Sequence, residues 1–149
     1  MLLKAFLGCL LMTVAHFLPQ YRNNILNGHS IPDPCCRGRV WARVGHTGPS
    51  QSGLNKFGID FKLNGNRFTA QVCLADSDGD GVVNGIELGL NTTLYSVGTL
   101  CHFVGSYPIT PILNAFLKHW NLLANPSGHP GFCDKPHCPT QLRYPCGPC

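Results

Sequence analysis

The cysteines of this 149-residue chain constrain its fold more than any other feature. The chain has nine cysteines, and eight of them follow residue 34. An even number of cysteines in an exported protein indicates disulfide bonds, and eight cysteines allow 105 pairings among which sequence cannot choose. Cys35 and Cys36 should take different partners, because a bond between adjacent cysteines strains the backbone. The candidates are Cys35, Cys36, Cys73, Cys101, Cys133, Cys138, Cys146 and Cys149.

The first fifteen residues predict export. Lys4 gives a positive start, residues 5–15 are apolar but too few to span a bilayer, and Thr13 and Ala15 offer a small-residue cleavage site. We expect a signal peptide over residues 1–15, which removes Cys9, and a secreted, extracellular protein. The alternative is a short buried N-terminal helix. No other run of about 18 apolar residues occurs, so no membrane span is predicted.

Regular structure should be sparse, because the chain contains 17 glycines and 12 prolines. Residues 39–46 alternate like a strand, and residues 57–63 and 66–73 flank an Asn-Gly pair as the arms of a β-hairpin do. Residues 20–26 allow a short helix, and residues 111–124 carry apolar side chains at helical spacing. The expected fold is a small, irregular, disulfide-stapled α+β domain with short hairpins and a helix in its C-terminal half.

The stretch 76–87, DSDGDGVVNGIE, concentrates negative charge in a chain of net charge +4. Carboxylates at alternate positions repel one another unless a cation lies between them. The spacing matches the EF-hand calcium loop, with a glycine at position 6, where the chain must turn. An all-oxygen ligand set favours Ca²⁺, and the alternative is a solvated acidic turn. The predicted ligands are Asp76, Asp78, Asp80, the carbonyl of Val82, Asn84 directly or through water, and Glu87.

The flanks of this loop differ from those of a paired EF-hand. Residues 66–75 favour a strand or an irregular segment, and the short helix expected after the loop should end at Gly89. No second calcium loop occurs in the sequence. A single loop of this kind is more often a structural clamp than a calcium sensor, so we expect a clamp.

Two further surface features stand out. Arg37, Arg39 and Arg43 surround Trp41 and predict a solvated strand face, with a glycan or an anionic partner as the alternative. The run is too sparse for nucleic-acid binding. Asn91 begins the sequon Asn-Thr-Thr, which predicts N-glycosylation.

Several stretches of the chain together resemble temptin-like proteins, which carry the temptin Cys/Cys disulfide domain. They are PQYRNNILNGHSIPDPC, VWARVGH, NKFGIDF, FTAQVCLADSDGDGVVNGIELG and HPGFCD. The resemblance covers about residues 18–90 and 128–134. It implies a non-enzymatic component of a water-borne attractant pheromone complex, as in marine molluscs, acting with other secreted proteins. The family's paired cysteines would correspond to Cys35 or Cys36 with Cys73, and Cys133 lies in a further matching motif.

This resemblance divides the chain into segments. Residues 16–90 form the temptin-like domain with the calcium loop, and residues 91–125 are an atypical insertion with a helix. Residues 126–149 are a cysteine- and proline-rich tail that we expect to be held by bridges rather than by a core.

Two other function classes stay open. The first is a copper-binding redox protein or monooxygenase-associated module, with His16, His29 and His46 as candidate ligands. The second is a calcium-dependent matrix or adhesion module. We interpret the Cys-Gly-Pro-Cys sequence at 146–149 as structural, since a redox role needs a thioredoxin-like setting. The sequence indicates neither a catalytic set nor a small-molecule substrate.

Overall fold

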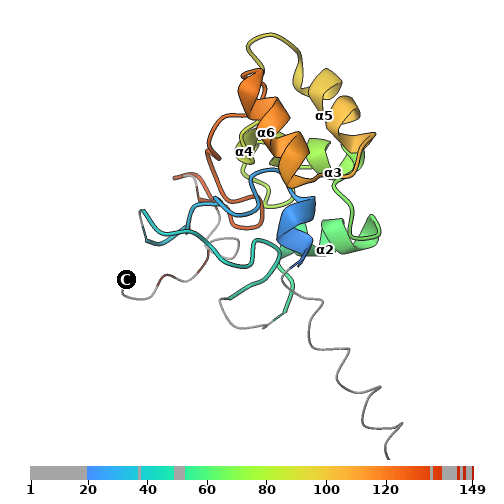
Figure 1. Ribbon diagram of the computed structural model, residues 1–149. Helices are drawn as coiled ribbons and strands as arrows, with labels where there is room; N and C mark the ends of the chain where they lie inside the picture. Colours follow the sequence, from blue (N-terminus) through green and yellow to red (C-terminus); the bar gives the residue numbers. More distant parts are fainter. Residues whose placement is uncertain are drawn as a thin grey trace, which may run out of the picture.

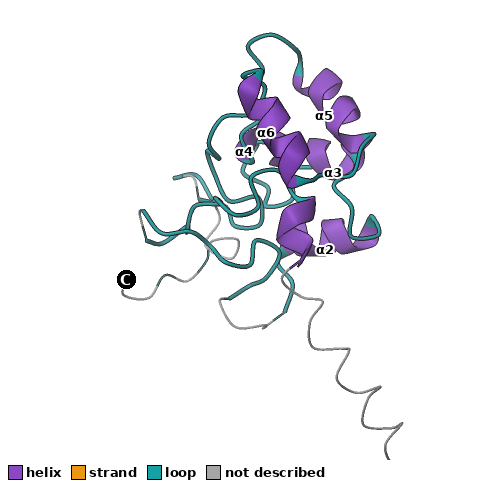
Figure 2. Ribbon diagram, in the orientation of Figure 1, coloured by secondary structure: helices purple, strands orange, loops and turns teal. Residues whose placement is uncertain are grey.

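The computed structural model describes residues 20–149 except 37, 49–52, 135, 139–143, 145, 147 and 148. The predicted signal peptide, His16 and Arg37 therefore lie outside the described residues. Every named element is helical, and α3 lies between α5 and α2 (Figures 1 and 2). None of the described helices has the length and apolar character that a bilayer crossing requires. The elements are η1 (Gln20–Asn24), α2 (Lys56–Leu63), α3 (Ala70–Leu74), α4 (Asn84–Glu87), α5 (Val97–Gly105) and α6 (Pro111–His119).

The predicted β-hairpin is wrong, because its first arm is helical and its second arm is a loop followed by a short helix. Its first arm is α2, which Asn55 caps by accepting a hydrogen bond from the backbone amide of Gly58 at 2.9 Å. Phe57 and Phe61 lie four residues apart on the buried face. Ile59 is 42% exposed. This arm, predicted as a strand from the Asn-Gly pair that follows it, therefore combines one buried helical face with exposed apolar positions.

The Asn-Gly pair ends a helix instead of turning a hairpin. Gly65 has a φ of 70°, and the backbone amide of Asn66 donates to the carbonyl of Phe61 at 3.0 Å. A left-handed residue of this kind is a common helix terminator. Thr69 then caps the N-terminus of α3 with its side chain. The second hairpin arm is thus a loop followed by a short helix.

The other predicted elements fare differently. The strand expected over residues 39–46 is wrong, since the described chain there has only isolated bridges, which join Val40 to Pro32 and His46 to Leu54. The helix predicted over 111–124 is confirmed over Pro111–His119 as α6 but ends five residues early, and the short helix allowed at 20–26 appears as the 3-10 helix η1. Of the predicted α+β fold, the described part of the chain retains the helices and the disulfides.

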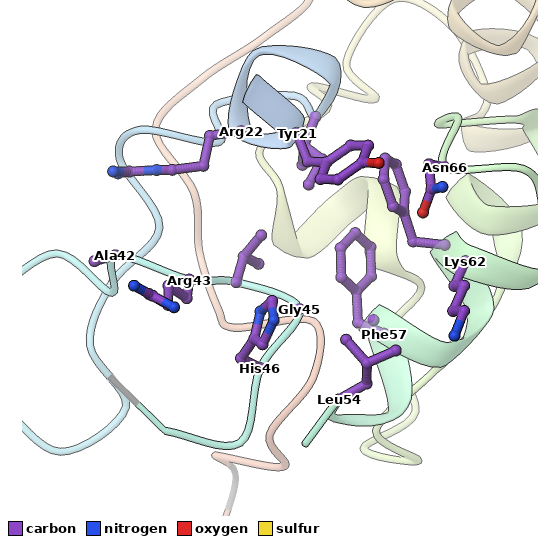
Figure 3. Close-up of a pocket in the computed structure, with 14 residues that line it drawn as sticks. Tyr21, Arg22, Ala42, Arg43, Gly45, His46, Leu54, Phe57, Lys62 and Asn66 are labelled. Atoms are coloured by element: carbon purple, nitrogen blue, oxygen red, sulfur yellow. The ribbon is translucent and has the colours of Figure 1, made fainter. Parts of the chain in front are cut away.

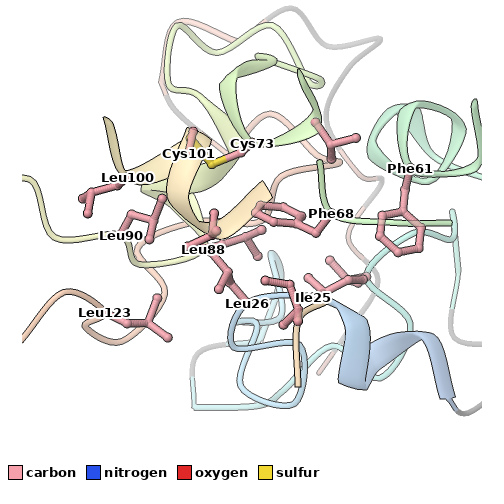
Figure 4. Close-up of a cluster of buried hydrophobic side chains, with 14 of the residues drawn as sticks. Ile25, Leu26, Phe61, Phe68, Cys73, Leu88, Leu90, Leu100, Cys101 and Leu123 are labelled. Atoms are coloured by element: carbon pink, nitrogen blue, oxygen red, sulfur yellow. A yellow bond between two sulfur atoms is a disulfide. The ribbon is translucent and has the colours of Figure 1, made fainter. Parts of the chain in front are cut away.

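Buried apolar side chains form one core beneath the helices (Figure 4). Val72 of α3, Leu100 and Val104 of α5 and Leu117 of α6 join residues from the loops. The Cys73–Cys101 bridge lies within this cluster and fastens α3 to α5. It also ties the segment predicted as an insertion to the rest of the fold.

The structure contains four disulfides among its described residues. They are Cys35–Cys146, Cys36–Cys149, Cys73–Cys101 and Cys133–Cys138. The adjacent cysteines take different partners, as expected. The pairing that the resemblance implied, between Cys73 and one of these neighbours, is wrong. Both cysteines of the Cys-Gly-Pro-Cys sequence bond to distant residues, which agrees with a structural role.

The tail contributes a small aromatic core besides its bridges. Trp41 makes edge-to-face contacts with Phe132 and Tyr144, at ring-centroid distances of 5.5 and 5.0 Å. His129 is fully buried beside the same indole, 5.8 Å from it. The expectation that bridges alone hold residues 126–149 is therefore wrong, because apolar packing also fixes this segment.

Candidate metal site in the acidic loop

The acidic loop runs between two short helices. Helix α3 ends at Leu74, and α4 occupies the last four loop positions. Of residues 66–75, predicted as a strand or an irregular segment, 66–69 are irregular and Ala70–Leu74 is helical, so this flank resembles a helix-loop-helix frame more than the sequence suggested. The Cys73–Cys101 bridge fixes α3, and Gly85 of α4 lies against it, since a Cβ there would be 2.6 Å from Cys73 Sγ.

The aspartates shape the loop by accepting hydrogen bonds from its own backbone. Asp76 accepts from the amides of Gly79, Asp80 and Gly81 at 2.9–3.1 Å. Asp80 accepts from the amide of Val82 at 2.7 Å. Gly79 and Gly81 have φ values of 75° and 89°, which side-chain-bearing residues rarely adopt. The turn therefore depends on these glycines and folds around the carboxylates.

Three carboxylates converge inside this turn. One oxygen each from Asp76, Asp78 and Asp80 lies within 4.8 Å of the others. Asp78 is 2% exposed, and its Oδ2 has no hydrogen-bond partner among the described residues. Burial, followed by the charges of Asp80 and Asp76, raises the pKa of Asp78 from 3.8 to about 7. This arrangement is unfavourable for three bare carboxylates and suits a bound cation.

The remaining predicted ligands have different surroundings. The side-chain amide of Asn84 donates to Val72 O at 2.7 Å and to Ser77 Oγ at 2.8 Å, and its oxygen accepts from the amide of Ser77 at 3.3 Å. Asn84 therefore joins the loop to α3. Val82 is half-buried and anchored through its amide. Neither residue is a member of the carboxylate group.

Glu87 is fully buried but does not belong to the group of three aspartates. It lies against the tail: a Cβ on Gly128 would be 2.8 Å from Glu87 Oε1 and 3.6 Å from Asp134 Oδ2. The amide of Ser127 donates to the carbonyl of Glu87 at 2.8 Å. The structure thus brings three of the six predicted ligands together and places Glu87 beside a second acidic residue.

Sequence reasoning missed the contribution of the tail to this loop. His137 Nε2 lies 2.9 Å from the carbonyl oxygen of Asp80, and Cys133–Cys138 closes a small ring around this region. The motif HPGFCD was noted only through the family resemblance. No spacing rule links His137 to residues 76–87, because its contact with Asp80 spans more than fifty residues.

The other sequence-derived site residues do not converge in the same way. His29 is exposed and pairs with Asn23 Oδ1 at 2.8 Å, whereas His46 is half-buried on another segment. In the described ranges, no histidine belongs to a cluster of three metal-ligating side chains. Asn91 Nδ2 donates to Asn121 O at 2.9 Å, and its glycosylation stays a prediction.

Comparison with known proteins places the chain in a family. A family model described as Temptin C-terminal matches residues 15–106, which is more than half of the chain and includes the acidic loop and α5. Temptin from Aplysia californica is 44% identical over 102 residues, which cover 64% of this chain and 78% of that protein. No solved structure matches. Because the family model matches more than half of its length, the chain belongs to the temptin family.

Proposed function

We propose that this protein is a secreted, non-enzymatic signalling component that binds one Ca²⁺ in residues 76–87. The ion would act as a structural clamp, and the protein would work in a water-borne attractant complex with other secreted proteins. The observation that carries the metal proposal is the buried Asp78 carboxylate, which shares the turn with Asp76 and Asp80. A Ca²⁺ ion would neutralise this charge and take oxygen ligands from all three.

The ligand set follows from the loop. Asp76, Asp78 and Asp80 would bind through side-chain oxygens, and Val82 through its carbonyl. Glu87 would complete the shell from α4. The side-chain nitrogen and oxygen of Asn84 are both hydrogen-bonded to Ser77, so Asn84 would bind the ion through a bridging water. A rigid frame on both sides of the turn supports a clamp over a sensor, since α3 is bonded to α5 and α4 packs on that bridge.

The surface of α5 and α6 supports a role in binding other proteins. A groove between these helices has a volume of about 350 Å³, and charged residues are absent from its described lining. Trp120 is 58% exposed and Leu94 is 66% exposed in it. Contiguous exposed apolar side chains mark interaction surfaces more often than catalytic ones. The lining is Leu94, Tyr95, Thr99, Leu100, Phe103, Phe116, Trp120 and Leu122.

Thermal unfolding of Asp78→Asn in calcium and in chelator tests the metal proposal. The wild-type protein should gain about 2.7 kcal/mol when free Ca²⁺ is 100 times its dissociation constant. The variant should lose most of this gain. In chelator it should equal or exceed the wild type in stability, because an amide removes a buried charge from the group.

Asp33→Asn is the matched control, because it makes the same chemical change away from the loop. Asp33 accepts hydrogen bonds from the amides of Cys35 and Cys36. This variant should be slightly less stable in both conditions and keep the full response to calcium. An unchanged calcium response in Asp78→Asn would contradict the metal proposal.

Fractionation of secreted fluid tests the complex. The protein should elute with other secreted proteins in size-exclusion chromatography and remain with them after chemical cross-linking. Elution as a free monomer throughout, with no cross-linked partner, would contradict the signalling-complex proposal. Metal analysis of the purified protein tests the redox alternative, which one copper ion per chain together with oxygen consumption would favour.

A further inference from the structure

A second site lies away from the acidic loop, where η1, residues 42–46 and α2 enclose a cavity of about 560 Å³ (Figure 3). This volume lies within the range of about 300–1,000 Å³ that small-molecule sites occupy. The cavity arises where two backbones cross. Gly45 and Gly58 are in such close contact that a Cβ on Gly58 would be 2.0 Å from the carbonyl oxygen of Gly45. The amide of Asn55 also donates to that carbonyl, at 3.0 Å.

The walls of the cavity are apolar and largely aromatic. Phe57 and Phe61 stack at a centroid distance of 6.0 Å, and Tyr21 meets Phe61 edge to face at 6.3 Å. Both phenylalanines are buried, and Val44 and Leu54 add aliphatic surface. Such walls suit a hydrocarbon chain or a ring, because binding would remove from water the apolar surface that Tyr21 and Leu54 leave exposed.

The charged groups around this cavity are all basic. Arg22, Arg43 and Lys62 belong to its lining, and none of its described lining residues is acidic. Arg22 donates through Nε to the carbonyl of Gly28 at 3.0 Å, whereas Arg43 and Lys62 lie on opposite sides in Figure 3. Asp60, the acidic residue of α2, accepts from Ser77 Oγ at 2.6 Å instead. Charges of one sign beside low-dielectric walls attract a ligand of the opposite sign.

We propose that this cavity binds a small amphipathic carboxylate, with its apolar chain or ring against Phe57, Phe61 and Leu54 and its carboxylate at Arg43, while Lys62 adds positive charge from the opposite side. The planar guanidinium of Arg43 suits a carboxylate, since it offers two parallel N–H donors. Lys62 adds a flexible second charge from α2. His46, also in the lining, has its pKa lowered by burial and by Arg43, and so offers a neutral hydrogen-bonding group. The described lining of the cavity contains no residue of the calcium loop, although Asp60 of α2 joins the two regions through Ser77. The bound molecule would add a small-molecule cargo to the proposed function.

Calorimetric titration with decanoate, compared with the uncharged decanol, tests this site. Decanoate should bind at one site per chain, and decanol at least about tenfold more weakly. The double variant Arg43→Gln with Lys62→Gln should bind decanoate about tenfold more weakly than the wild type. Leu54→Trp should abolish binding of both ligands, because the larger side chain fills the cavity.

A double variant of equal charge change provides the control. Arg39→Gln with Lys118→Gln alters two exposed residues outside the lining and should leave decanoate affinity unchanged. Circular dichroism and a free-thiol assay should show that every variant is folded and fully bridged. The proposal is overturned if the folded wild type does not bind decanoate, or if the two double variants bind it equally. The decanoate titration is also repeated with Asp78→Asn. This variant should lose the calcium response and still bind decanoate, so failure of the calcium proposal is detected separately from failure of this one.

Discussion

The acidic loop and the cationic cavity differ in charge and in how the chain builds them. The loop takes its three converging carboxylates from five consecutive residues, and its own amides hold them in place. The cavity takes its lining from three separated segments, and it exists only because two glycines let their backbones touch. A site built from consecutive residues can thus be predicted from residue spacing. A site built from separated segments depends on packing, which residue spacing does not reveal.

The largest expected effect follows removal of the Cys73–Cys101 disulfide, which holds the helices on both sides of the acidic loop. Replacing Cys73 and Cys101 with alanine opens a link across 28 residues. Chain entropy then predicts a loss of about 3.5 kcal/mol in the free energy of unfolding. Calcium affinity should fall as well, because α3 and α4 both rest on this bridge. Chemical denaturation and calcium titration measure the two effects.

Removing Cys133 and Cys138 is the matched comparison, since that bridge spans only 5 residues. Its loss should cost about 2 kcal/mol. Equal calcium affinity in both bridge variants and the wild type would mean that the loop keeps its shape without the frame.

A smaller loss of stability is expected when only the cavity is changed. In Gly58→Ala the new Cβ must displace the carbonyl of Gly45, which should cost about 2–3 kcal/mol and weaken decanoate binding. The calcium response should persist. Gly98→Ala makes the same change in α5, where a Cβ would meet only Ser96 Oγ at 3.8 Å, so its stability should not fall. If both variants unfolded at the same denaturant concentration, the crossing of the two backbones would have no structural importance.

The last effect depends on pH and concerns the tail, which packs against Glu87 of the acidic loop. Burial lowers the pKa of His129 from 6.5 to about 3, so the folded protein keeps this ring neutral while the unfolded chain protonates it. Its contribution to stability is therefore full above pH 6.5 and is lost as the pH falls toward 3. The expected slope is up to about 1.4 kcal/mol per pH unit.

His129→Gln should flatten this part of the stability curve, and His119→Gln, at the exposed end of α6, should leave it unchanged. Urea denaturation at several pH values between 4 and 7 measures the slope. Identical slopes in the wild type and in His129→Gln would show that His129 is not held neutral.

Sequence reasoning captured the features that consecutive residues determine. It identified Asp76, Asp78 and Asp80 as a group, the separate partners of the adjacent cysteines, and α6. It failed where one pattern fits two structures. The alternating apolar residues of α2 imitate a strand, and only packing shows that Phe57 and Phe61 are buried while Ile59 is not. The position of Glu87 depends on Gly128, a partner that no local pattern indicates.

The two bridges from Cys35 and Cys36 to Cys146 and Cys149 span 111 and 113 residues, so they join the last residue of the chain to a point near its beginning. A protease that cuts any loop between these anchors leaves two pieces that remain one covalent molecule. Fragments of nicked protein should therefore separate on a gel only after reduction. That linkage would keep the folded body of the protein whole after such a cut.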